Sequence, residues 1–241
     1  MTETDDRLTT RPLEEIETWV FDVDNTLYHA RYDLFSQIDV RICEFVAGHL
    51  GIAPAEARRL QKGYFREHGS TLRGLMSVHG VDAAAFLDYV HDIDVTWVPP
   101  NGALDRALGA RSGRKIAFTN GSSDHAGRVI QQLGVGHHIE AVFDIVDADF
   151  EPKPAPATYE RFVDRHDIDP ARAVMFDDIA RNLAPAAALG MTTVWVRNDE
   201  PYSTDGAKQI SIDYETDDLV AWLETHTGPR RAERGSQRDS L

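Results

Sequence analysis

The spacing of apolar positions predicts an alternation of short buried strands and amphipathic helices over most of the chain. Runs of consecutive apolar residues predict five strands, at Glu17–Asp24, Lys115–Thr119, Ala141–Val146, Ala173–Phe176 and Thr192–Val196. Helical spacing predicts a helix before the second strand, at Ala103–Ala110, and three helices after it, at Ser123–Leu133, Ala155–His166 and Ala180–Leu189. This alternation indicates an α/β fold with a doubly wound, mostly parallel sheet, whose ligands bind beyond the carboxyl ends of the strands.

Between the first two expected strands the chain has only the helical period. From Asp33 to about His91, apolar residues recur three and four positions apart. Pro54 is expected to open a second helix, and Ser70 and Asp82 are expected to cap a third and a fourth. We therefore expect an all-helical subdomain inserted after the first strand.

The expected organisation has four parts. An α/β core is formed by 16–30 and 101–226, and the helical insertion occupies 31–100. Residues 1–15 and 227–241 are expected to be disordered tails, the second because it is rich in Arg, Gly and Ser.

Composition and charge narrow the class of partner. The formal charge of −15 argues against nucleic acid and against an anionic membrane surface. No run approaches the ~18 consecutive apolar residues of a membrane helix, and the polar, acidic N-terminus does not resemble a secretory signal. The single Cys43 excludes an internal disulfide and fits a reducing cytoplasm, where we expect the protein to act. A small molecule is the expected partner, and the sequence does not disclose the oligomeric state.

Two carboxylates one residue apart end the first expected strand. Asp22 and Asp24 leave the strand in the same sense, because successive side chains alternate across it. Two like charges this close destabilise a fold unless a cation, a proton or a ligand's metal compensates them. Taken alone, the pair fits equally well an ordinary turn, in which Asp bonds to the backbone.

Three later segments carry complementary chemistry at expected strand ends. They are Thr119-Asn120-Gly121, a Lys between two prolines at Glu151-Pro152-Lys153-Pro154, and the acid pair Asp177-Asp178 with Asn182 beyond it. Each has a structural alternative: a strand–helix turn, a solvated surface lysine and a helix N-cap pair, respectively.

In this order and spacing, the four segments resemble the four motifs of the haloacid dehalogenase-like (HAD) phosphohydrolase superfamily. The resemblance runs from Phe21 to Asn182 and implies an α/β core with a small helical cap inserted after the first motif. It makes Asp22 the nucleophile that forms an aspartyl-phosphate. It also implies a magnesium ion held by the Asp22 carboxylate, the main-chain carbonyl of Asp24 and Asp177.

The resemblance assigns the remaining roles as well. Asp24 would protonate the leaving alcohol and then activate water, which needs a raised pKa that proximity to Asp22 favours. The Thr119 hydroxyl and the backbone N–H groups of Asn120 and Gly121 would bind the phosphoryl oxygens. A phosphate dianion and ionised Asp22 carry about three negative charges, which Mg²⁺ and Lys153 would balance. Asp178 and Asn182 are expected to support the acidic loop from behind.

Several stretches are more specific and look like the pyrimidine 5′-nucleotidase branch. They are Asp24–Tyr28, Thr71–Met76, Phe86–Asp94, Asn182-Leu183 after the acid pair, and Leu189–Met191. The implied substrate is a pyrimidine nucleoside 5′-monophosphate, and Tyr64 and Arg73 are candidate contacts to its ribose or base. Alternatives that stay open are a phosphatase or phosphomutase acting on a sugar phosphate or other small metabolite, and a homologue that binds phosphate without turnover. A phosphoryl-relay receiver gathers similar residues but has no place for the helical insertion.

Overall fold

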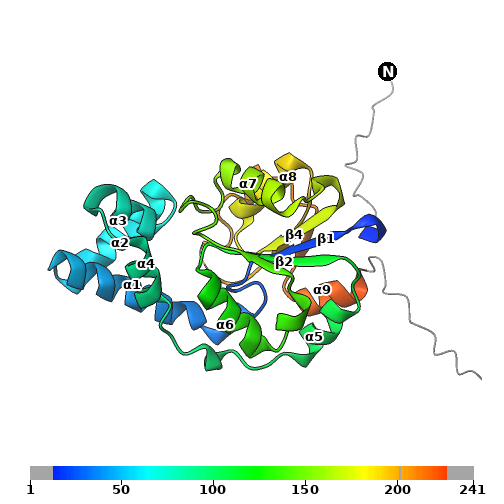
Figure 1. Ribbon diagram of the computed structural model, residues 1–241, viewed down its shortest axis with the longest axis horizontal. Coiled ribbons are helices and arrows are strands. Elements are labelled where there is room, and N and C mark those ends of the chain that lie inside the picture. The colour runs from blue at the N-terminus through cyan, green and yellow to red at the C-terminus, as the bar shows by residue number, and fades with distance from the viewer. Residues whose placement is uncertain (1–12, 201, 227–241) are drawn as a thin grey trace, which may run out of the picture.

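A computed structural model describes residues 13–200 and 202–226 of the chain. Its centre is a six-stranded parallel sheet with strand order β3-β2-β1-β4-β5-β6 (Figure 1). The strands are β1 Thr18–Phe21, β2 Arg114–Phe118, β3 Ala141–Phe143, β4 Ala173–Asp177, β5 Thr192–Val196 and β6 Tyr214–Thr216. The predicted doubly wound α/β fold is confirmed.

Helices cover both faces of the sheet (Figure 1). The helices α5 Gly102–Gly109, α6 Ser123–Leu133 and α9 Leu219–Thr225 lie on one face, and α7 Pro156–His166 and α8 Leu183–Leu189 lie on the other. Each face has its own core, and β1 contributes to both, because Trp19 and Phe21 pack into one cluster and Val20 into the other. The alternation of side chains along a fully buried strand thus joins the two layers.

The observed elements differ from the expected ones mainly at their ends. The strand β1 stops at Phe21 because the chain turns at Asn25, whose φ is 61°, and β3 stops at Phe143. Leu13–Glu15, placed in the N-terminal tail by the sequence, form a 3-10 turn. The expected tails at 1–12 and 227–241 lie outside the described residues. Over the described ranges, no helix is long and apolar enough to cross a membrane.

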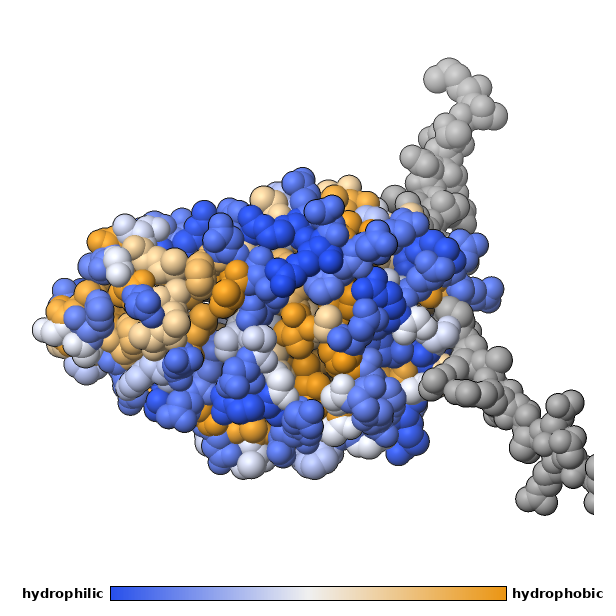
Figure 2. All heavy atoms as spheres, viewed as in Figure 1, coloured by the Kyte–Doolittle hydropathy of each residue, from blue (hydrophilic) through white to orange (hydrophobic). Residues whose placement is uncertain are grey.

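Four of the helices between β1 and β2 form a bundle at one end of the molecule (Figure 1). They are α1 Leu34–Leu50, α2 Pro54–His68, α3 Thr71–His79 and α4 Ala83–Val90, and they share a separate apolar core. Ser70 Oγ and Asp82 Oδ1 accept hydrogen bonds from backbone N–H groups in the first turns of α3 and α4, as the sequence predicts for N-caps. Figure 2 shows apolar surface at this end of the molecule. Phe35 and Val40 of α1 are among the exposed large apolar side chains of the described residues.

The bundle gives a matched pair of glycine predictions. A Cβ on Gly74 of α3 would lie 2.4 Å from Cβ of Tyr64, whereas a Cβ on Gly63 of α2 would meet no atom within 4 Å. Gly74→Ala is therefore expected to lower the free energy of unfolding by about 1–3 kcal/mol through overpacking. Gly63→Ala is expected to raise it by about 0.5–1 kcal/mol, because Ala loses less conformational entropy in a helix. Urea unfolding of both variants checks the pair, and two changes of the same sign would contradict this packing.

Candidate active site

The acidic side chains meet at the carboxyl ends of β1 and β4, which are neighbours in the middle of the sheet. Asp22 directly follows β1 and its backbone N–H donates to Phe176 O at 2.9 Å, and Asp177 is the last residue of β4. Carboxylate oxygens of Asp22, Asp177 and Asp178 all lie within 4.8 Å of one another, and all three residues are buried. Residues 155 positions apart in the chain thus form one cluster of oxygen ligands.

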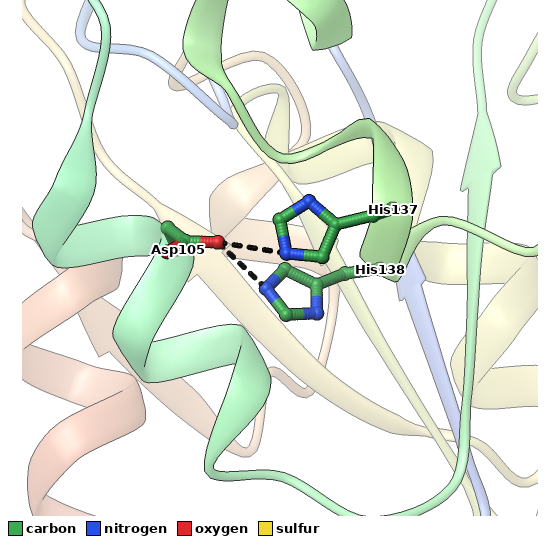
Figure 3. A group of neighbouring side chains, drawn as sticks. All are labelled: Asp105, His137 and His138. Atoms are coloured by element: carbon green, nitrogen blue, oxygen red, sulfur yellow. Dashed lines mark hydrogen bonds and ion pairs between the residues drawn. The ribbon is translucent and has the colours of Figure 1, made fainter.

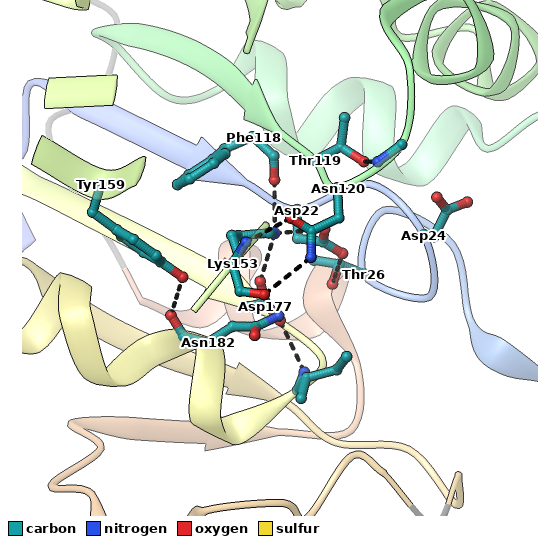
Figure 4. A network of polar contacts seen from close by, with 12 residues as sticks. Asp22, Asp24, Thr26, Phe118, Thr119, Asn120, Lys153, Tyr159, Asp177 and Asn182 are labelled. Atoms are coloured by element: carbon teal, nitrogen blue, oxygen red, sulfur yellow. Dashed lines mark hydrogen bonds and ion pairs between the residues drawn. The ribbon is translucent and has the colours of Figure 1, made fainter. Parts of the chain in front are cut away.

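Lys153 is the cation inside this cluster (Figure 4). Its Nζ donates to Asp22 Oδ1 at 2.8 Å, to Asp177 Oδ2 at 2.7 Å and to Phe118 O at 2.8 Å, and the residue is 2% exposed. The sequence predicts Lys153 at a strand end, which is wrong: it lies in the loop before α7, ten residues after β3 ends. The surface-lysine alternative is excluded by its burial.

The segment after β2 holds the lysine loop in place. The side chain of Asn120 forms two hydrogen bonds to the backbone of Lys153, accepting from its N–H at 2.7 Å and donating to its carbonyl at 3.2 Å. The N–H of Gly121 donates to Thr119 Oγ1 at 2.9 Å. Thr119, Asn120 and Gly121 all line the cavity described below, but the Gly121 N–H that the sequence assigns to phosphate has a partner within the chain.

Hydrogen bonds orient the second acid pair. Asp177 Oδ1 accepts from Asn182 Nδ2 and from the N–H of Ile179, both at 2.9 Å, which turns Oδ2 toward Lys153. Asp178 Oδ2 accepts from Asn198 Nδ2 at 2.9 Å. Asn182 thus holds the side chain of Asp177, and Asp178 lies within the cluster of oxygen ligands.

The electrostatics of the cluster favour a cation. Burial raises the pKa of Asp22 to about 7, because Asp177 adds to this effect and Lys153 only partly offsets it. Burial, together with the neighbouring carboxylates of Asp22 and Asp177, raises the pKa of Asp178 well above its usual range. Three buried carboxyl groups beside one ammonium can all ionise only where further positive charge compensates them, and a divalent ion with oxygen ligands supplies that charge. The donor set thus fits Mg²⁺.

Asp24 has a different environment. Its carboxylate points away from the cluster (Figure 4), accepting from Tyr28 Oη at 2.7 Å and lying 2.9 Å and 3.1 Å from Nε2 of His125. Burial acts to raise the pKa of Asp24, but His125 and Tyr28 outweigh it and lower that pKa to about 2. The expectation that Asp22 raises it is wrong, because these two donors stabilise the ionised carboxyl.

A cavity of about 240 Å³ lies between the bundle and the core. Asp22, Asp24 and Lys153 line one side, and the opposite wall includes Phe65 of α2 and Phe86 of α4. The cavity therefore has charged side chains on the core side and apolar side chains on the bundle side.

The two candidate substrate contacts are engaged elsewhere. Tyr64 Oη is 2.7 Å from Nε2 of His79 inside the bundle, and Arg73 forms an ion pair with Glu151 at 3.2 Å. Neither residue is part of the cavity lining.

Sequence reasoning missed three residues around the acids. Thr26 Oγ1 donates to Asp22 Oδ2 at 3.0 Å, and Tyr28 and His125 hold Asp24. Thr26 and Tyr28 each lie four positions after the Asp that they contact, and a turn brings residues at this spacing together. The local sequence could therefore have indicated both contacts. His125 lies 101 positions from Asp24, and nothing local connects the two.

With the geometry known, comparison with protein families identifies the class. Residues 16–190 match the model of the family described as haloacid dehalogenase-like hydrolase. The chain belongs to that family. The matched segment contains all four motifs.

A curated protein is similar to this hydrolase in sequence. A curated relative is "Phosphate metabolism protein 8" of Saccharomyces cerevisiae, 25% identical over 216 residues, which are 82% of this chain and 66% of the yeast protein. This chain therefore spans just under two thirds of that relative.

Solved structures show the same architecture. The putative HAD-hydrolase YfnB of Bacillus subtilis, bound to magnesium, has a TM-score of 0.56 and 14% identity, covering 87% of this chain and 97% of YfnB. A HAD phosphatase from Thermococcus onnurineus has a TM-score of 0.55 and 19% identity, with 87% and 96% covered. L-2-haloacid dehalogenase of Xanthobacter autotrophicus has a TM-score of 0.54 and 16% identity, with 88% and 100% covered.

Proposed function

We propose that this hydrolase is a magnesium-dependent phosphomonoesterase that acts through an aspartyl-phosphate on Asp22. The observation that carries the proposal is the buried cluster of Asp22, Asp177 and Asp178 around Lys153. A nucleophile for uncharged carbon needs no such cluster. A nucleophile for a phosphate dianion does, because the carboxylate and the substrate repel each other unless cations lie between them.

The residues that would hold the ion are Asp22, Asp177 and the main-chain carbonyl of Asp24. The ion would supply Lewis-acid polarisation of the phosphoryl group and neutralise its charge. Lys153, fixed by its contacts to Asp22 and Asp177, adds a permanent positive charge beside the nucleophile. Thr26 donates to Asp22 Oδ2 and so restricts rotation of the attacking carboxylate.

The chemistry needs two proton transfers, both at Asp24. In the first step an Asp22 oxygen forms a bond to phosphorus, the ester P–O bond breaks, and Asp24 gives its proton to the leaving oxygen. In the second step water attacks the phosphorus and Asp24 takes the water's proton, which releases phosphate and restores Asp22. Asp24 ionises readily without substrate, and the approach of a dianionic ester raises its pKa and favours proton uptake.

The substrate class we propose is a nucleoside 5′-monophosphate, with a pyrimidine base. The apolar wall of the cavity, with Phe65 and Phe86, is suited to a flat ring held beyond the phosphate. The stretches that resemble the pyrimidine 5′-nucleotidase branch favour the smaller base.

The test is a panel assay of phosphate release with and without Mg²⁺. The panel contains UMP, CMP, AMP, sugar monophosphates and a 2-haloacid, with halide release measured for the last. We expect Mg²⁺-dependent release that is fastest with UMP or CMP and no halide release. Isomer formation without release would indicate a mutase, and halide release without metal would replace the proposal with a dehalogenase.

Asp24→Asn tests the proton-transfer role. The variant is expected to lower steady-state hydrolysis about 10²–10⁴-fold, because the amide can neither give nor accept the proton. The Mg²⁺ concentration for half-maximal effect is expected to change little, since the ligand atom of Asp24 is its main-chain carbonyl. Hydrolysis at the wild-type rate would remove Asp24 from this role.

A further inference from the structure

Two stacked histidines link the helical bundle to the carboxylate of Asp24. His125 lies in the first turn of α6 and is fully buried. Its ring stacks on that of His91, with centroids 4.6 Å apart and planes within 13° of parallel. His91 is the C-cap of α4, and its Nδ1 lies 2.9 Å from Oγ of Ser122 in the core. The pair thus lies where bundle and core meet beside the site.

The hydrogen-bond pattern fixes which nitrogen of His125 carries hydrogen. Nε2 faces both oxygens of Asp24, which can only accept when the carboxylate is ionised. Nδ1 is buried and has no partner among the described residues. A hydrogen on Nδ1 would be an unsatisfied buried donor, so the tautomer with hydrogen on Nε2 fits this environment.

The donors of Asp24 are distributed unequally. Oδ1 accepts from Tyr28 Oη at 2.7 Å and lies 2.9 Å from His125 Nε2, whereas Oδ2 has only the longer contact of 3.1 Å. Oδ1 is therefore held, and Oδ2 is the oxygen left to exchange a proton with a ligand in the cavity.

This arrangement also separates Asp24 from the oxygen ligands of the ion. A divalent cation held by the carboxylates of Asp22 and Asp177 would attract another nearby carboxylate, and a carboxylate bound to the ion could not exchange a proton with the leaving group. We propose that His125 is a positioning residue: with Tyr28 it holds the Asp24 carboxylate away from the metal ligands and toward the leaving group. The proposal rests on the proposed function, in which Asp24 transfers the proton.

Stacking makes the position of His125 depend on the bundle. Arg128 of α6 donates to the carbonyl oxygens of His91 and Ile93, so the segment that leaves the bundle is tied to the same helix as His125. The set of contacts that positions the Asp24 carboxylate is therefore complete only when α4 lies against α6.

The test compares leaving groups in single turnover. His125→Ala is expected to slow release of phenol from phenyl phosphate by about 10²-fold, because phenolate needs a proton as it leaves. Release from 2,4-dinitrophenyl phosphate is expected to change less than about threefold, because that leaving group needs none. His125→Gln places an amide donor near Nε2 and is expected to restore most of the rate, and Tyr28→Phe to show the same selectivity more weakly. His49→Ala, an exposed histidine on α1, is the control.

The possible outcomes distinguish a failure of the positioning role of His125 from a failure of the proposed function. Equal losses on both esters, with the wild-type enzyme active, would assign His125 a merely structural role and leave the proposed function standing. Absence of Mg²⁺-dependent release from either ester by the wild-type enzyme would overturn the proposed function and the positioning role together.

Figure 3 shows a second cluster, formed by Asp105, His137 and His138, which shares no residue with the first. Nε2 of His137 and Nε2 of His138 lie 3.1 Å and 2.9 Å from the same oxygen, Oδ1 of Asp105. Asp105 is on α5, and the histidines are on the 3-10 turn before β3. Gly109 makes room for the inner ring, because a Cβ there would lie 3.2 Å from Cε1 of His138.

Two imidazole nitrogens and a carboxylate oxygen converging on one point are the ligand types of zinc. A tetrahedral zinc ion with bonds of about 2.0–2.1 Å holds its ligand atoms about 3.3 Å apart. The two N–O distances of 3.1 Å and 2.9 Å are within a few tenths of an ångström of that spacing, and the ligand atoms of the three residues all lie within 4.8 Å of one another. The side chain of His137 is 65% exposed, so the fourth position is open to water. We infer that Asp105, His137 and His138 form a zinc site separate from the magnesium ligands.

Calorimetric titration of Zn²⁺ tests this site. The full chain is first stripped of bound metal and then kept in excess Mg²⁺, so that the magnesium ligands are occupied. One binding event of micromolar affinity is expected, weakened at least about tenfold in His137→Ala and in His138→Ala, and unchanged in His49→Ala. His137 is largely exposed, so its replacement should not disturb folding. Identical titrations of the wild type and both variants would overturn the inference.

Discussion

Asp22→Asn is expected to lower Mg²⁺-dependent hydrolysis on the order of 10⁴-fold or more while the protein stays folded. The amide oxygen is a poor nucleophile for phosphorus, so no phosphoryl group is transferred to the protein. The fold should persist because burial and Asp177 already raise the pKa of Asp22 to about 7, so a neutral side chain suits this position. Steady-state release of phosphate measures the first effect, and thermal unfolding measures the second.

Asp88→Asn is the matched control for that substitution. Asp88 is exposed on α4, and the same change of one oxygen to nitrogen there should leave hydrolysis unchanged. If a clean preparation of Asp22→Asn kept even a tenth of the wild-type rate, Asp22 would not be the nucleophile.

Lys153→Met is expected to lower the free energy of unfolding by about 3–5 kcal/mol near pH 8 as well as to stop hydrolysis. The substitution leaves the carboxylates of Asp22 and Asp177 buried without their cation, and breaking a buried ion pair has this magnitude. Met fills nearly the same volume, so the loss reports charge more than packing. Urea unfolding at several pH values measures it.

The loss in free energy of unfolding caused by Lys153→Met should become smaller as the pH falls. The pKa of Asp22 is raised in the folded protein, and losing Lys153 raises it further, so the folded state binds a proton that the unfolded chain has lost. Stability from such a group is present below its unfolded pKa of 3.8 and is lost as the pH rises through the folded pKa. The variant should therefore be closer to the wild type at pH 5 than at pH 8.

Lys62→Met is the control for the loss of a lysine. Lys62 is also paired, to Asp39 at 2.8 Å, but its side chain is 55% exposed. An exposed pair contributes at most about 1 kcal/mol, with little dependence on pH in this range. Equal deficits for the two lysine variants would contradict the buried network.

Periodicity predicted the core of the fold because its strands are buried on both faces. Thr192–Val196 and Ser123–Leu133 have the predicted bounds. The edge strand β6, Tyr-Glu-Thr, was missed because it is short and half polar, and its pairing with β5 depends on contacts that no local pattern contains. The helix α9 that follows was not predicted for a related reason. It is only seven residues long, and the packing of Leu219 and Trp222 into the core stabilises it.

The acid pairs of the site were predictable because they lie where apolar strands end: Asp22 directly follows β1, and Asp177 is the last residue of β4. The roles of other residues depend on distant partners. Asn120 was expected to offer its backbone to phosphate, yet its side chain binds the backbone of Lys153, 33 positions away. Similarly, the pKa of Asp24 follows from His125 rather than from nearby Asp22, because a direct donor outweighs a carboxylate whose charge Lys153 offsets.

The most direct test of the account is mass spectrometry of the acid-quenched reaction. The hydrolase is mixed with Mg²⁺ and its best substrate from the panel, quenched within one turnover and digested. We expect the mass of one phosphoryl group on the peptide that contains Asp22, and its absence without Mg²⁺ and in Asp22→Asn. Phosphate release at the full rate with no such adduct, or with the adduct on another residue, would contradict the account.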